Sequence, residues 1–236
     1  MASTVLAAGI ATGVGSLPHR DAAAAAASVL RCLPELPAVP QLPARSPHER
    51  LVAQPLHGIE GIEVAADGSV TVARSLGAAP AVPEALDDDA FGGLHAFCEQ
   101  ARRAARPPAR VKAQLAGPLT VGTALARAGV PADDAFAIGA HVVRARARAV
   151  ERAIATALPD SALVLFYDEP ALVLWRRGEA PLDREVATDV LSGALASTGC
   201  VAGVHVCGPG DLRLALAAGP DVVHLDVQSL SFDDAV

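Results

Sequence analysis

Short apolar runs alternate with amphipathic segments over the second half of the chain. From residue 109 onward the expected order is strand, helix, strand, helix, strand, helix, strand. The strands are nearly continuous apolar runs, as in strands buried on both faces, and the segments between them have helical periodicity. This alternation indicates a parallel sheet wrapped in helices. The expected strands are 110–116, 162–167, 201–206 and 221–227, and the expected helices are 119–128, 133–158, 183–197 and 211–218.

The first half of the chain begins with a small and apolar run and continues into a proline-rich stretch. Residues 9–15, closed by Ser16, are typical of a strand ending in a turn. Asp21 is expected to cap an alanine-rich helix that Pro34 stops. Residues 33–47 contain five prolines, which exclude a helix, so an extended loop of the kind that often lies over a site is expected.

A hairpin and a further helix are expected before the alternating half. Residues 62–64 and 70–72 alternate apolar and polar positions around an Asp-Gly turn, which is a strong hairpin signal. Three consecutive aspartates then precede an amphipathic segment, and the last of them, Asp89, is expected to cap a helix over 90–105.

Composition excludes several classes of protein. The chain has 236 residues, of which 52% are hydrophobic and 19% charged, which argues against disorder, and its net charge of −7 argues against a nucleic-acid partner. It has neither an apolar stretch of membrane-span length nor an export signal, so we expect a cytoplasmic protein without a membrane partner. Lys112 is the only lysine; together with the abundant alanine this indicates coding bias and carries no functional inference.

The apolar run 201–206 contains the sharpest candidate for chemistry. His205 lies in this strand and Cys207 follows it directly, so the two side chains share one face. Imidazole nitrogen and thiolate sulfur suit zinc. The alternative is that Cys207 is a small buried hydrophobe and His205 a hydrogen-bonded core residue. The four cysteines are widely spaced, which favours thiols or ligands over disulfides.

Polar residues at the ends of strands decide between two α/β architectures. An open doubly wound sheet would carry a phosphate-binding glycine turn after its first strand, and residues 13–15 lack the third glycine of that motif. A (β/α)8 TIM-type barrel, in which the site lies at the C-terminal ends of the strands, fits better. We therefore expect residues 1–236 to form a single barrel domain with an inserted β-hairpin. The polar residues near those ends are Ser16, Gln114, Asp168, His205, Cys207 and Asp226.

Four ordered motifs resemble the C-terminal catalytic barrel of the cobalamin-independent methionine synthase family, within the uroporphyrinogen decarboxylase and methionine synthase superfamily. They are Thr-Gly-Val-Gly-Ser-Leu-Pro at 12–18, Leu-Ala-Gly-Pro-Leu-Thr at 115–120, Tyr-Asp-Glu-Pro-Ala at 167–171 and His-Val-Cys at 205–207. The resemblance implies a zinc-dependent methyltransferase that acts on the thiol of homocysteine or a related thiol.

The resemblance also implies roles for individual residues. His205 and Cys207 would bind zinc, which would deprotonate the substrate thiol. Ser16 would contact the carboxylate of the substrate, and Asp168 would hold its ammonium group and so act as the catalytic anchor. Other interpretations are a turn hydroxyl for Ser16 and a loop or helix cap for Asp168.

The chain departs from the family's pattern in three ways. Asp226 stands where the family has a glutamate as its third zinc ligand, and the family's fourth ligand, a later cysteine, has no counterpart. We count about six of the eight β/α units, so either the sequence is a fragment or a partner, such as a second copy, covers the gap. The family's N-terminal barrel is also missing, which leaves the methyl donor open between methyl-folate and methylcobalamin.

Three other functions remain open at this point. The superfamily also contains decarboxylases, which need no zinc, and corrinoid-dependent methyltransferases, which share the His-x-Cys zinc site. A non-catalytic relative with a vestigial site is the third. The zinc content of the purified protein separates both methyltransferases from the vestigial relative.

Overall fold

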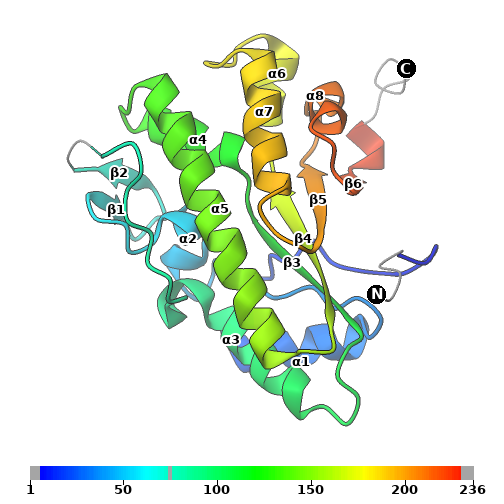
Figure 1. The fold of residues 1–236 in the computed structure, drawn as a ribbon. Coiled ribbons are helices and arrows are strands. Elements are labelled where there is room, and N and C mark those ends of the chain that lie inside the picture. The colour runs from blue at the N-terminus through cyan, green and yellow to red at the C-terminus, as the bar shows by residue number, and fades with distance from the viewer. Residues whose placement is uncertain (1–5, 74–75, 230–236) are drawn as a thin grey trace.

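The computed structural model describes residues 6–73 and 76–229, and a parallel four-stranded sheet lies at its centre (Figure 1). The strand order is β3-β4-β5-β6, so neighbours in the sequence are neighbours in the sheet. Apolar residues with few breaks form these strands, as the sequence predicts. The strands are β3 (Arg110–Ala116), β4 (Ala162–Asp168), β5 (Val201–Val206) and β6 (Val222–Leu225).

Two extended segments of the first half continue the sheet beyond β3. Ala38 forms a parallel bridge with Lys112, where the Lys112 N–H donates to Pro37 O at 2.9 Å. Ser16 forms a parallel bridge with Gln41. The expectation of a full strand at 9–15 is therefore wrong. The proline-rich segment, expected as a loop, also pairs with β3 through Ala38. Proline lacks an N–H donor, so this segment pairs over only a few residues.

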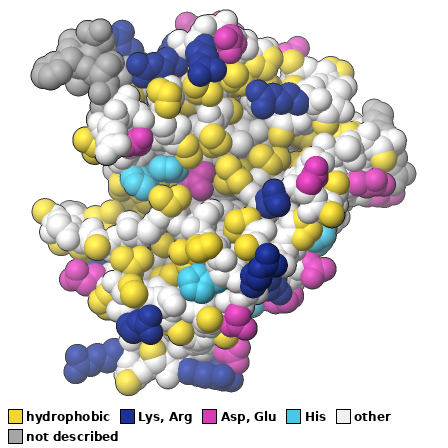
Figure 2. Space-filling view, turned by 180° about the vertical axis from the view of Figure 1, so that it is seen from behind, with side chains coloured by type: hydrophobic (Ala, Val, Ile, Leu, Met, Phe, Trp, Pro, Cys, Tyr) yellow, Lys and Arg dark blue, Asp and Glu magenta, His cyan; other side chains and the backbone are white. Residues whose placement is uncertain are grey.

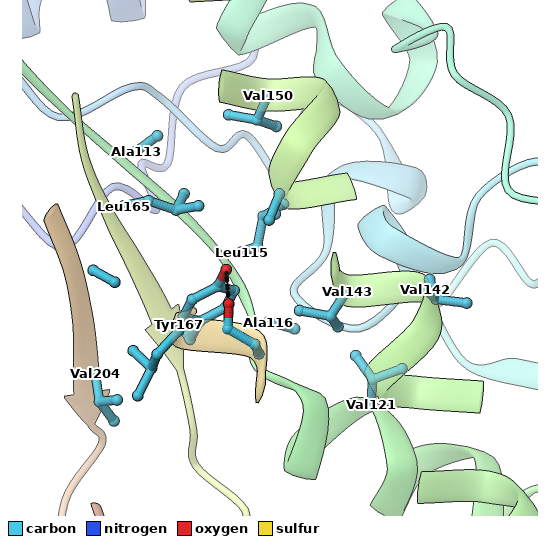
Figure 3. Close-up of a cluster of buried hydrophobic side chains, with 14 of the residues drawn as sticks. Ala113, Leu115, Ala116, Val121, Val142, Val143, Val150, Leu165, Tyr167 and Val204 are labelled. Carbon is cyan, nitrogen blue, oxygen red and sulfur yellow. Dashed lines mark hydrogen bonds between the residues drawn. The ribbon is translucent and has the colours of Figure 1, made fainter. Parts of the chain in front are cut away.

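Helices cover one face of the sheet and bury most of the core. Figure 3 shows side chains from alternate positions of three strands directed toward α5, whose Val143 and Val150 face them. The Tyr167 hydroxyl donates to Ala194 O at 2.9 Å, which ties β4 to α7. The helices are α1 (Ala22–Cys32), α2 (Ala53–Leu56), α3 (Asp88–Arg103), α4 (Pro118–Arg127), α5 (Ala132–Ala157), α6 (Leu172–Arg177), α7 (Arg184–Leu195) and α8 (Leu212–Ala217), with 3-10 turns η1 (Pro47–Glu49) and η2 (Val227–Ser229).

The helices anticipated from periodicity are confirmed to within a few residues, with one correction at a cap. Asp21 accepts from Ala24 N and caps α1, as expected. At α3 the cap is Asp87 rather than Asp89, because the Asp87 carboxylate accepts from the Asp89 N–H at 2.7 Å and the helix begins at Asp88. The short α2 and α6 were not anticipated, since four to six residues give too little periodicity to recognise.

The expected hairpin is confirmed. β1 (Ile62–Val64) pairs antiparallel with β2 (Val70–Val72). Gly68 in its turn has φ +81°, a conformation that favours glycine.

The face of the sheet that points away from α4, α5 and α7 carries several polar side chains. Side chains at every second position of a strand point to the same face. On this face they are Lys112 and Gln114 of β3, Phe166 and Asp168 of β4, and His205 of β5. We call this surface the inner face. A small apolar cluster of Leu36, Val164 and Phe166 lies on it. Within the described residues, no helix combines the length and apolar character needed to cross a membrane.

Candidate functional site

One row of the inner face brings together an aspartate and two histidines. Asp168 is in register with His205, and His205 with His224, so the three side chains point to the same side at the C-terminal edge of the sheet. The two imidazole rings lie 4.4 Å apart between centroids. Figure 2 views the molecule from this side and shows histidine and acidic side chains among hydrophobic ones. The predicted convergence of Asp168 and His205 is therefore observed.

Asp168 is a buried carboxylate, one oxygen of which has no hydrogen-bond partner among the described residues. Its side chain is 4% exposed, and the oxygen without a partner is Oδ1. Burial raises the pKa of Asp168 to about 7, and the charge of Lys112 opposes that shift. A buried polar atom that no protein group satisfies is uncommon and indicates a place for a ligand.

The imidazole ring of His205 is neutral and has an unpaired nitrogen among the described residues. Burial, with smaller contributions from His224 and Lys112, lowers the pKa of His205 to about 4. The ring is therefore neutral at physiological pH, which is the form that binds metals. Its Nδ1 is buried and has no hydrogen-bond partner within residues 6–73 and 76–229.

Cys207 completes the predicted pair just beyond the end of β5. Its sulfur lies 3.9 Å from His205 O. Burial first, and then the carboxylates of Asp168 and Glu169, raise the pKa of Cys207 to about 12. In the protein alone this group is a neutral thiol, and a bound cation would reverse the local balance of charge.

His205 and Cys207 fit a zinc ion as part of a ligand set. One is a neutral imidazole with an unpartnered ring nitrogen and the other a thiol on the same strand end. In the described part of the chain, no three His, Cys, Asp or Glu side chains are grouped to hold a metal.

Asp226, the expected third ligand, is exposed, and its carboxylate has other partners. It accepts from Gln228 N at 3.0 Å and Ser229 Oγ at 2.5 Å, at the start of η2. These bonds lower the pKa of Asp226. Its role as a ligand stays a prediction.

Ser16 lies at the other side of the sheet, in the turn before α1. Its side chain is exposed, and Oγ donates to Gln41 Oε1 at 3.0 Å. The turn lies against β3, because a Cβ built on Gly15 would be 2.1 Å from the Gln114 side chain. Among the described residues no hydrogen bond joins Ser16 to Asp168. The structure thus places Ser16 beside the inner face without bringing it into contact with the carboxylate.

Glu169 has a structural role that fixes its neighbour Asp168. Its fully buried carboxylate accepts from Leu119 N and Thr120 N, both at 2.8 Å, and from Thr120 Oγ at 2.6 Å. These bonds satisfy free N–H groups at the start of α4. Since successive strand residues point to opposite sides, anchoring Glu169 to α4 directs Asp168 to the inner face.

Two further residues lie at this site: Lys112, for which the sequence supports no functional inference, and His224, which the sequence offers only as an alternative group to complete the metal site. Lys112 is completely buried on the inner face, and His224 stacks beside His205. Both follow from the period of a strand: Lys112 is two residues before Gln114, and His224 is two before Asp226.

No family model matches this chain, and neither a curated protein nor a solved structure matches it.

Proposed function

We propose that this protein is a zinc-dependent methyltransferase of the kind that the cobalamin-independent methionine synthases represent, and that it methylates the thiol of homocysteine or a related amino-acid thiol. One observation carries the proposal. Asp168 Oδ1 and His205 Nδ1 lie in one row of the sheet, buried and without partners, next to the Cys207 thiol. An amine anchor and two zinc ligands at one edge are what such a site requires.

The arrangement of the sheet supports a barrel as the scaffold. The extended segments through Ser16 and Ala38 and the strands β3 to β6 are parallel and follow sequence order without reversal. A doubly wound sheet reverses its order at a switch point and carries helices on both faces. Here α4, α5 and α7 pack on one face (Figure 1). The other face carries Lys112, Gln114, Asp168 and His205 beside a small apolar cluster. We take these segments as six β/α units of a (β/α)8 barrel whose site lies at the strand ends.

Residues of this chain would divide the work of binding. His205 and Cys207 would hold the zinc, with Asp226 as the expected third ligand, and the ion would supply the Lewis acidity that keeps the substrate sulfur deprotonated at neutral pH. Asp168 would pair with the substrate ammonium, since a carboxylate in a dry site is a strong partner for an amine. Ser16 would lie near the substrate carboxylate.

Neighbouring side chains would keep these groups in place and exclude water. His224 packs against the His205 ring and limits its rotation. Phe166 meets His224 edge to face at 6.2 Å between centroids. Gly203 leaves room for Phe166, because a Cβ there would lie 2.6 Å from the ring. This apolar wall lowers the local dielectric and strengthens the charge pairing at Asp168.

A methylation assay tests the proposed function. Zinc-loaded protein is incubated with homocysteine and either methyl-tetrahydrofolate or methylcobalamin, and methionine is measured. We expect turnover with one of the two donors and at least a 100-fold loss in Cys207→Ser. Cys32→Ser is the matched control, because Cys32 is an exposed free thiol at the end of α1. Equal rates in Cys207→Ser and the parent chain would contradict the proposal, and no turnover with either donor would favour a vestigial site.

A further inference from the structure

A metal held by His205 and Cys207 needs at least one more ligand from the protein. The expected one, Asp226, is exposed and lies just beyond the end of β6. Both of its carboxylate oxygens have partners: Oδ1 accepts from Gln228 N at 3.0 Å and Oδ2 from Ser229 Oγ at 2.5 Å. These local bonds hold the start of η2, and turning the carboxylate toward His205 would break them.

His224 lies on β6 directly opposite His205. The two residues are in register across the parallel pair of β5 and β6, so their side chains point to the same side of the sheet. Cys207 is one residue past the end of β5 and two after His205, which keeps it on that side. Two imidazoles and one thiol therefore come together where β5 and β6 end.

The ring of His224 is available to a ligand, whereas the carboxylate of Asp226 is not. His224 is half-buried, and its ring contacts are with the rings of His205 and Phe166. Among the described residues no hydrogen bond or ion pair engages its ring nitrogens. The buried Nδ1 of His205 is likewise without a partner in that part of the chain.

The spacing of the two rings is close to what a shared metal requires. Tetrahedral zinc binds imidazole nitrogen at about 2.0–2.1 Å, which puts the centroids of two bound rings about 5 Å apart. The centroids of His205 and His224 are 4.4 Å apart, with 38° between the ring planes. Among the described residues no three such side chains are already grouped to hold a metal, so both rings would turn toward the ion as it binds.

We propose that His224, rather than Asp226, is the third zinc ligand, so that two imidazoles and one thiolate hold the ion. This inference rests on the proposed function, because it concerns the same zinc. A set of two nitrogens and one sulfur disfavours hard cations such as Mg²⁺ and Ca²⁺, which prefer oxygen. An imidazole is neutral, so the bound ion keeps one more unit of positive charge than it would with a carboxylate in its place.

X-ray absorption at the zinc edge identifies the ligands directly. Each bound imidazole adds scattering from the outer atoms of its ring, and a carboxylate does not. The zinc-loaded parent chain should show two imidazoles and one sulfur, and His224→Gln should show one imidazole. Asp226→Asn should give the parent spectrum. His95→Gln, which removes an exposed histidine of α3, is the matched control and should also give the parent spectrum.

Zinc affinity, measured against a competing chelator, gives a second readout. His224→Gln should bind zinc at least about 10-fold more weakly than the parent chain, and Asp226→Asn and His95→Gln should stay within about 3-fold of it. Loss of the packing between His224 and His205 would also weaken binding. The number of bound imidazoles therefore decides between a ligand and a packing neighbour.

The outcomes separate this inference from the proposed function. Two imidazoles and one sulfur in the parent chain, with one imidazole in His224→Gln, support the inference even when the methylation assay shows no turnover. A single imidazole in the parent chain, or a spectrum that Asp226→Asn changes and His224→Gln does not, overturns the inference and leaves methyl transfer to its own assay. A parent chain that binds no stoichiometric zinc also overturns it.

Discussion

Lys112 shows at the residue scale how a buried cation opposes folding. Burial lowers the pKa of Lys112 from 10.5 to about 8 in the folded protein, although Asp168 and Cys207 partly oppose the shift. Between pH 8 and 10.5 the unfolded chain therefore binds more protons than the folded protein. In this window stability rises with pH, and below pH 8 the folded state carries a constant penalty of about 3 kcal/mol.

The variant Lys112→Met removes that penalty. The free energy of unfolding of Lys112→Met should exceed that of the parent chain by about 2–3 kcal/mol more at pH 7 than at pH 10, because the parent recovers stability as Lys112 loses its proton. Urea unfolding of both proteins at the two pH values measures the difference. Groups remote from Lys112 titrate equally in both chains and cancel, whereas Asp168 and His205, whose pKa values the Lys112 charge lowers, do not. A difference that does not change with pH would show that Lys112 keeps an ordinary pKa.

The sequence identified some of these residues and missed others for a physical reason. Asp168, His205 and Cys207 are polar residues at the ends of apolar strands, and that position alone marks them. Lys112 lies inside its strand, where a nearly continuous apolar run does not show which face is covered by helices and which is not. The opposing charge of Asp168 depends on the register of strands far apart in the sequence.

At the scale of elements, Arg146 joins α5 to the C-terminal end of α2 and to the loop before α3. Its side chain is 1% exposed and donates to Pro55 O at 3.1 Å, Pro83 O at 2.8 Å and the carbonyl of His57. Replacing Arg146 with leucine leaves these carbonyls without their donor, and we expect a loss of about 3 kcal/mol in the free energy of unfolding. Chemical unfolding measures it.

Arg148, two residues along the same helix, is exposed and gives the control. Arg148→Leu should change the free energy of unfolding by less than about 0.5 kcal/mol. Equal effects of the two substitutions would contradict the idea that Arg146 holds the loops.

The hairpin gives a second prediction at this scale. Gly68 has φ +81°, and a Cβ there would lie 2.0 Å from Arg50 Cδ. Gly68→Val should lower the free energy of unfolding by at least about 1 kcal/mol, through backbone strain and displacement of Arg50. The hairpin is remote from Asp168 and His205, so zinc content should not change. Loss of zinc from Gly68→Val, measured by metal analysis, would place the hairpin in the site.

Elements that depend on residues close together in the sequence could be predicted, whereas those that depend on residues far apart in the sequence could not. The hairpin and the caps of α1 and α8 depend on residues within a few positions of each other. The pairing of the proline-rich segment with β3 depends on residues some 70 positions apart, and its prolines favour extended backbone with any partner. The cap of α3 shifted from Asp89 to Asp87 because three aspartates in a row are equally good candidates from composition alone.

At the scale of the whole molecule, the alternation of strands and helices sufficed to predict a parallel sheet covered by helices. The sequence order within the sheet is the usual one for parallel strands joined by helical crossovers, because consecutive strands tend to lie next to each other. The six parallel segments together carry the polar inner face, and the groups of the proposed site come from several of them. Function at this scale depends on assembling distant residues at one edge, which a single motif does not show.

Zinc binding tests the central claim most directly. Apo protein is titrated with zinc against a competing chelator, using the parent chain, Cys207→Ser and Cys200→Ser, whose thiol lies at the opposite end of β5. We expect one zinc per chain, an affinity at least about 10-fold weaker in Cys207→Ser, and no change in Cys200→Ser. Absence of stoichiometric zinc, or an affinity that Cys207→Ser leaves unchanged, would contradict the assignment of this edge of the sheet as a zinc site.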